Sequence, residues 1–152
     1  MILSRTSQYA LRAALHLAHQ PEGRLARAND IADALGVPAN YLSKILHAMA
    51  RSGLLVSERG PAGGFRLSRP AEAIPLAEVV AVFDELGAGR RCLLGRARCL
   101  DSSPCAAHVR WRDVADGVMS FFDDTTVADL LTPGAPPTPE PVAAGGRNGR
   151  IT

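Results

Sequence analysis

The chain has 152 residues, 47% of them hydrophobic, so it has room for one aliphatic-core domain, or one domain with an appendage. No apolar run approaches the ~18 residues that a membrane-spanning helix needs, and the N-terminus lacks a signal-like apolar stretch, so we expect a cytoplasmic protein. In that reducing compartment its three cysteines are not expected to form disulfides, which makes metal or redox chemistry the relevant question.

The formal net charge of +2 conceals an uneven distribution along the chain. Residues 1–69 hold nine Lys or Arg against four acids, a net charge of +5, whereas residues 70–131 hold six Arg against ten acids, a net charge of −4. A basic first half is what a polyanion-binding surface needs, although scattered surface arginines give the same count. Charge alone therefore leaves nucleic-acid binding and a plain solvated surface both open.

Three helices are predicted in the first third of the chain. Apolar residues at helical spacing indicate a helix over residues 4–19, with Ser4 as its cap, and a short helix over 29–35. A glycine- and proline-containing turn at 36–38 leads into a third helix over 39–52. The apolar stripe of the third helix consists of Leu42, Ile45, Leu46 and Met49.

A β-hairpin is predicted directly after the third helix. Residues 54–58 and 65–68 have the composition of strands, and the glycine-rich segment 60–64 joins them. Two short helices joined by a glycine turn and followed by a hairpin is the order of a winged helix-turn-helix domain. We therefore assign residues 1–70 to such a DNA-binding domain.

The second half of the chain is predicted to be helical around an irregular centre. A helix over 74–86, an irregular stretch over 87–104 and a long helix over 104–123 make residues 71–131 a linker helix, a cysteine loop and a dimerisation helix. The proline- and glycine-rich residues 132–152 are predicted to be a disordered tail. The predicted fold class is mainly α with a small β-hairpin wing.

The face of the third helix opposite its apolar stripe carries hydrogen-bonding side chains near the N-terminus of that helix. In a recognition helix, this end meets the base edges and phosphates of DNA. The wing adds arginines that can enter a minor groove, and glycines that allow close backbone approach. The candidate DNA-binding residues are Ser4, Arg5, Asn40, Tyr41, Ser43, Lys44, His47, Arg59, Gly60, Gly63, Gly64 and Arg66.

Three cysteines and a histidine follow one another as Cys92-x6-Cys99-x5-Cys105-x2-His108. Thiolates are soft ligands for iron–sulfur clusters or zinc, but the close Cys pairs of structural zinc sites are absent from this sequence. Flanking arginines would lower the thiol pKa values and balance an anionic cluster. An iron–sulfur cluster, a thiol redox switch without metal, and zinc or no ligand at all remain open. His108 is either the fourth ligand or a surface histidine.

Four segments of the sequence resemble the Rrf-two family of bacterial transcription regulators, of the IscR and NsrR type. They are SRTSQYALR at 4–12, IADALGVP at 31–38, YLSKIL at 41–46 and RGPAGGFRL at 59–67, and the resemblance extends over about residues 1–131. It implies a winged helix-turn-helix homodimer that binds a palindromic double-stranded DNA operator and pairs through a long C-terminal helix.

The resemblance also implies a set of cluster ligands. Cys92, Cys99 and Cys105 match the three cysteines of cluster-binding members, although the first gap has six residues rather than the more common five. IscR-type members place a histidine where His108 stands, whereas NsrR-type members use an acid of the partner's first helix near the position of Gln8. Glutamine is a poor iron ligand, which favours His108 and leaves Gln8 open. A two-iron and a four-iron cluster both remain possible.

We therefore predict a non-enzymatic transcription regulator, a repressor, that senses redox, nitric oxide or iron–sulfur status through a cluster. One alternative is a regulator of the same family that senses thiol oxidation or a small ligand without a cluster. A second alternative is a small iron–sulfur electron-transfer protein, which leaves the basic first half of the chain unexplained. A third is an enzyme with a cysteine nucleophile, but the sequence gives no sign of an oxyanion hole. The apolar residues expected to pair two long helices are Val109, Val114, Val118, Phe121 and Phe122, and Trp111 lies either at the same surface or in the core of one subunit.

Overall fold

The computed structural model describes residues 3–86, 92–94 and 101–131. Its helices and strands confirm the predicted class, mainly helical with one small antiparallel hairpin. No helix in these ranges is both long and apolar enough to cross a membrane. The elements are α1 (Arg5–Ala18), α2 (Ala28–Leu35), α3 (Ala39–Arg51), β1 (Leu55–Glu58), β2 (Gly64–Leu67), the 3-10 turn η1 (Ala71–Ala73), α4 (Leu76–Ala81), α5 (His108–Asp124) and the 3-10 turn η3 (Ala128–Leu130).

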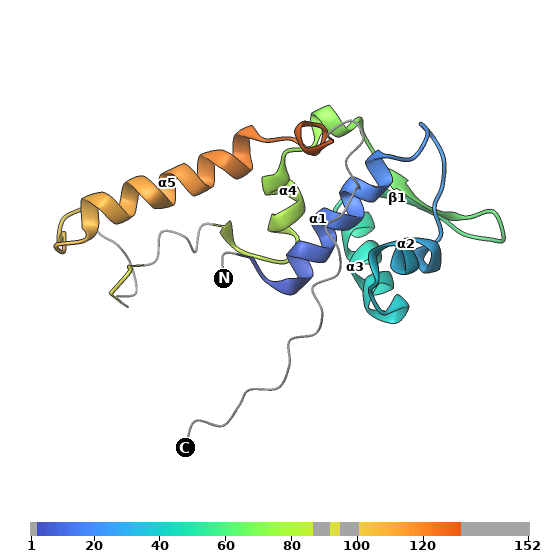
Figure 1. Cartoon of the computed structure of the whole chain (residues 1–152), viewed down its shortest axis with the longest axis horizontal. Helices are drawn as coiled ribbons and strands as arrows, with labels where there is room; N and C mark the ends of the chain where they lie inside the picture. Colours follow the sequence, from blue (N-terminus) through green and yellow to red (C-terminus); the bar gives the residue numbers. More distant parts are fainter. Residues whose placement is uncertain (1–2, 87–91, 95–100, 132–152) are drawn as a thin grey trace, which may run out of the picture.

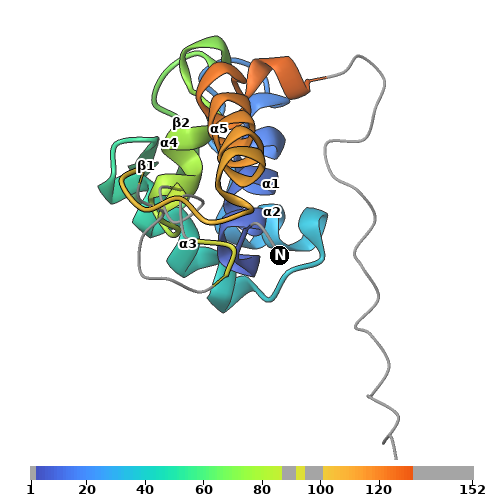
Figure 2. The same cartoon turned by 90° about the vertical axis from the view of Figure 1, so that its left-hand side faces the viewer.

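Helix α1 runs through the middle of the molecule and contacts α2, α3 and α4 (Figure 1). The β1–β2 hairpin protrudes at one end, and α5 extends from the other end alongside α4 (Figures 1 and 2). One continuous apolar core joins these elements. Its largest fully buried apolar side chains are Ile31, Leu35, Leu42, Ile45, Leu46, Met49, Ile74, Leu76, Val79, Val80 and Val127.

The ends of the first helices follow from local chemistry. The Oγ of Ser4 accepts a hydrogen bond from the backbone N–H of Ser7 at 3.2 Å, which confirms Ser4 as the cap of α1. Helix α2 ends at Gly36, whose φ of 64° lies in the left-handed region that a side chain disfavours. Pro38 precedes the first turn of α3, and the predicted apolar stripe of α3 is fully buried.

The second half differs from the predicted helix boundaries, and α4 begins at Leu76 rather than at residue 74. Helix α4 ends at Ala81 rather than near residue 86, in a closing turn in which the backbone N–H groups of Phe83 and Asp84 both donate to the carbonyl of Val80. Helix α5 begins at His108 rather than at residue 104, because the N–H of His108 closes a turn onto the carbonyl of Cys105 at 2.9 Å. Cys105 therefore precedes the helix instead of lying in its first turn.

Candidate DNA-binding face and cysteine segment

The exposed face of α3 presents polar and basic side chains. Asn40, Tyr41, Lys44 and His47 are exposed and Ser43 is half-buried, as a recognition helix requires. The stripe on the opposite side anchors the helix to the core, so these side chains project from a rigid frame.

Tyr41 is held by α1 rather than projecting independently. Its hydroxyl lies 2.6 Å from the Oγ1 of Thr6 in a hydrogen bond, and its ring packs edge-on against Tyr9 with centroids 5.9 Å apart. The guanidinium of Arg12 lies over the Tyr9 ring and donates to the carbonyl of Leu35 at 2.7 Å. The sequence patterns did not indicate the role of Thr6, because its partner lies 35 residues away.

The wing is an antiparallel pair in which Leu55 faces Leu67 and Glu58 faces Gly64. Gly60 has a φ of 102°, which a side chain would strain. A Cβ at Gly63 would lie 2.3 Å from the carbonyl oxygen of Glu58, and one at Gly64 would lie 2.5 Å from that of Ala26. These glycines therefore allow the wing to fold tightly against its own chain, in addition to any contact with DNA.

The remaining predicted DNA-binding residues lie at the N-terminus of α1 and along the wing. Ser4 and Arg5 are exposed at the start of α1, and Arg59 is exposed at the end of β1. Arg66 is half-buried on β2, where it lines a cavity of about 760 Å³ between β2 and the segment that follows α1. The ring of His47 lies 5.2 Å from that of Phe65 on β2, which links the recognition helix to the wing.

Two of the three predicted cysteine ligands lie in the described part of the chain. Cys92 is buried and Cys105 is half-buried, and neither forms a disulfide with another described residue. Cys99 lies in 95–100, outside the described residues.

His108 is buried at the start of α5, and its Nε2 donates to the Oδ1 of Asp101 at 2.9 Å. Arg112 forms an ion pair with the same carboxylate oxygen. The hydrogen bond from His108, followed by the charge of Arg112, lowers the pKa of Asp101 below its ordinary value. The hydrogen bond to Asp101 engages Nε2, so Nδ1 is the other ring nitrogen. Asp101 thus fixes the ring, a role that the sequence patterns did not indicate.

The described residues do not form a complete metal site. Within residues 3–86, 92–94 and 101–131, no three His, Cys, Asp or Glu side chains come close enough to hold a metal ion. Gln8, the alternative fourth ligand, lies exposed on α1, where its Nε2 donates to the carbonyl of Leu3 at 3.2 Å. The thiol and imidazole groups of the predicted ligands suit an iron–sulfur cluster. The predicted set also includes Cys99, which lies outside the described residues.

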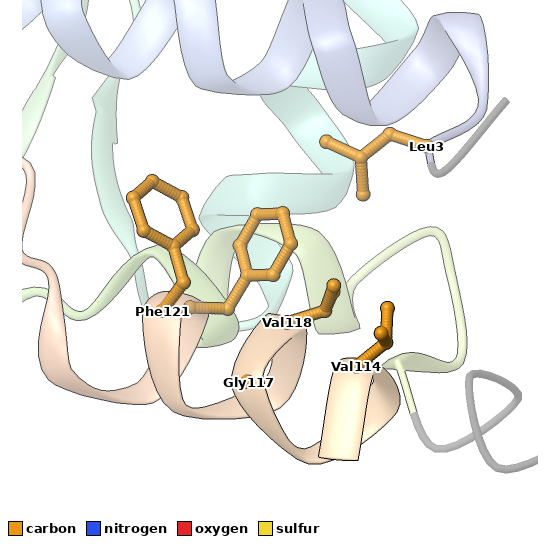
Figure 3. Close-up of a pocket in the computed structure, with 6 residues that line it drawn as sticks. Leu3, Val114, Gly117, Val118 and Phe121 are labelled. Atoms are coloured by element: carbon orange, nitrogen blue, oxygen red, sulfur yellow. The ribbon is translucent and has the colours of Figure 1, made fainter. Parts of the chain in front are cut away.

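Helix α5 has a second apolar face beyond the one packed on α4. Phe122 is buried in the protomer core, so it is not available for pairing two helices. Val109, Val114 and Phe121 are exposed by 68%, 57% and 52% respectively. Figure 3 shows Val114, Val118 and Phe121 projecting from α5 toward Leu3, around an apolar cavity of about 460 Å³.

Comparison with known proteins settles the family. The model of the Rrf2 family, described as iron-dependent transcriptional regulators, matches residues 3–133. The chain belongs to the Rrf2 family. It is 32% identical over 133 residues to an HTH-type transcriptional regulator of Aquifex aeolicus, covering 86% of this chain and 92% of that one. It is 33% identical over 131 residues to the regulator IscR of Vibrio atlanticus, covering 86% and 75% of the two chains.

Solved Rrf2 structures have the same fold. CymR, the global cysteine regulator of B. subtilis, superposes with a TM-score of 0.72 at 23% identity, over 84% of this chain and 94% of that one. IscR of T. potens superposes with a TM-score of 0.67 at 22% identity, over 84% of each chain. The predicted resemblance is confirmed, and the enzyme alternative is excluded because the family and its named relatives are transcription regulators.

Proposed function

We propose that this Rrf2-family regulator is a homodimeric repressor of a palindromic operator, and that it senses redox, nitric oxide or iron–sulfur status through an iron–sulfur cluster. A bound cluster supplies an iron centre that oxidants and nitric oxide modify. The residues that would hold it are Cys92, Cys99, Cys105 and His108, with Gln8 as the alternative fourth ligand.

The donor chemistry supports this assignment. Cys92 and Cys105 form no disulfide among the described residues, and thiolates are soft ligands that suit an iron–sulfur cluster. Asp101 orients His108 through a 2.9 Å hydrogen bond, as carboxylates do for metal-ligating histidines. The similarity to an IscR at 33% identity points in the same direction.

The observation that carries the proposal is a hydrogen bond between the two halves of the chain. The backbone N–H of Ser4, the cap of α1, donates to the Oδ2 of Asp84 at 2.8 Å. Asp84 lies eight residues before Cys92, and α1 packs against the recognition helix. A change in the cysteine segment therefore has a short covalent and hydrogen-bonded route to the DNA-binding face.

The homodimer proposal rests on the second apolar face of α5. A 17-residue helix with exposed Val114 and Phe121 at helical spacing is typical of a surface that is covered in the assembled protein. A twofold pair of such helices places two α3 helices for successive half-sites of a palindrome.

The direct test is anaerobic purification of the wild-type chain beside Cys99→Ser and Ser102→Ala, with visible spectra and iron and sulfide analysis. We expect wild type and Ser102→Ala to be brown with stoichiometric iron and sulfide, and Cys99→Ser to be colourless. Colourless, iron-free wild-type protein would contradict the cluster.

A second candidate is sensing by thiol oxidation without a cluster. The chain carries thiols at Cys92 and Cys105 that reversible oxidation can modify, and it is 25% identical to CymR of Staphylococcus aureus, which is also known in an oxidised form. This alternative predicts colourless protein whose affinity for its operator changes reversibly with peroxide and then with a thiol reductant.

A further inference from the structure

The wing is attached to the connector between α1 and α2 at two points, one on strand β2 and one at the tip. On strand β2 of the wing, Phe65 exchanges both backbone hydrogen bonds with Ala26, at 2.9 and 2.8 Å. At its tip, the Nη2 of Arg27 donates to the carbonyl of Pro61 at 2.7 Å. An isolated two-stranded hairpin is only marginally stable, so these attachments decide where the tip lies.

Arg27 is well placed to fix the tip. It caps the N-terminus of α2 by position, without a side-chain cap bond, and α2 packs directly against α3. Pro61 has no N–H, so its carbonyl is its only backbone hydrogen-bonding group. The side chain of Arg27 thus joins the tip of the wing to the frame that carries the recognition helix.

We infer that Arg27 is a positioning residue for DNA binding. Its hydrogen bond to Pro61 fixes the position of the wing tip relative to α3. This inference rests on the proposed function, in which the wing and α3 contact DNA together. Arg59 follows β1 directly and leads into the same turn, so its place on a DNA duplex depends on the tip. Without the bond to Arg27, DNA binding must order the tip, and affinity falls.

A plain charge effect is the competing explanation, and the chain offers a matched control. Arg24 is an exposed arginine on the same connector, so Arg24→Ala removes the same charge without touching the 2.7 Å bond to Pro61. Arg27 itself is exposed, and its replacement should leave the core intact. We expect thermal midpoints within about 2 °C of wild type for both variants.

The experiment is a double-mutant cycle on the full-length protein. The DNA probe is a duplex selected by wild type from a random-sequence library, beside a scrambled duplex of equal length. We expect Arg27→Ala to weaken binding to the selected duplex about tenfold, and Arg24→Ala less than about twofold. In an Arg59→Ala background, Arg27→Ala should cost less than about twofold, because it acts through the wing.

Three results would overturn the inference or its basis. An affinity of Arg27→Ala within twofold of wild type would contradict the inference. Equal losses in both backgrounds, with a salt slope reduced by about one, would identify a direct phosphate contact instead. If wild type selects no sequence over the scrambled duplex, the proposed function itself is contradicted. This failure is distinguishable from failure of the inference, because it is observed with wild type before any variant is compared.

Discussion

The two ends of the molecule are completed in different ways. At the DNA-binding end, α1, α2, α3 and the wing bury a continuous core within one chain, and the wing is tied down by hydrogen bonds of that same chain. At the other end, α5 keeps Val114 and Phe121 exposed, and no three ligand side chains gather in the described residues. The DNA-binding end is self-sufficient, whereas in the proposed function the other end is completed by a second subunit and a cluster.

The largest expected effect follows from the closed core of the DNA-binding end. Leu46 is fully buried on α3, so Leu46→Ala should lower the free energy of unfolding by about 3 kcal/mol through lost transfer energy and a cavity. Leu94, exposed by 66%, is the control at the sensing end, and Leu94→Ala should cost less than about 0.5 kcal/mol. Urea unfolding measures both, and equal costs would remove the contrast between the two ends.

The next effect concerns assembly rather than folding. Phe121→Asp places a charge on the exposed apolar face of α5 and should weaken self-association about 100-fold, because a charge is costly to bury. Ser120→Asp, at an exposed position one residue earlier, is the control and should leave association nearly unchanged. Sedimentation velocity over a concentration series reports both, and monomeric wild type at micromolar concentration contradicts the pairing.

A smaller effect tests the connection between the two ends. Asp84→Ala removes the acceptor of the Ser4 N–H and should lower the free energy of unfolding by about 1 kcal/mol. It should also reduce the difference in DNA affinity between the two signalling states. Glu85→Ala, an exposed neighbour, is the control. An unaltered response to signal in Asp84→Ala would show that the coupling takes another route.

The smallest effect is a pH dependence within α1. Burial lowers the pKa of His16, and the nearby His19 lowers it further. Just below the ordinary histidine pKa of about 6.5, His16 is protonated in the unfolded chain but not yet in the native one. The free energy of unfolding therefore falls as the pH drops through about 6.5. His16→Gln should flatten this slope in urea unfolding between pH 7.5 and 5.5. A steeper slope in the variant would contradict the assignment.

Much of the DNA-binding end could be predicted from local patterns. The stripe of α3, the cap at Ser4 and the glycine-rich wing are encoded by residues close together in sequence, and the structure confirms them. The start of α5 could not be predicted, because Pro104 is compatible with a first helical turn while the actual turn closes between Cys105 and His108.

The contacts that join distant segments had no local signal. Arg27 meets Pro61 across 34 residues, and Ser4 meets Asp84 across 80, so neither pair forms a pattern in the sequence. Phe122 was expected at the dimer face but is buried in the protomer, because helical periodicity cannot tell which of two apolar faces packs inward. The placement of Cys99 lies outside the described residues, so its role remains a prediction.

The most direct test of the account is the affinity of anaerobically purified protein for its selected duplex, before and after removal of the cluster, with Cys99→Ser measured alongside. The account predicts a change of at least about tenfold in wild type and none in Cys99→Ser, because the signal passes from the cysteine segment to α3. Equal affinities of the two wild-type forms would contradict the claim that the cysteine segment controls DNA binding.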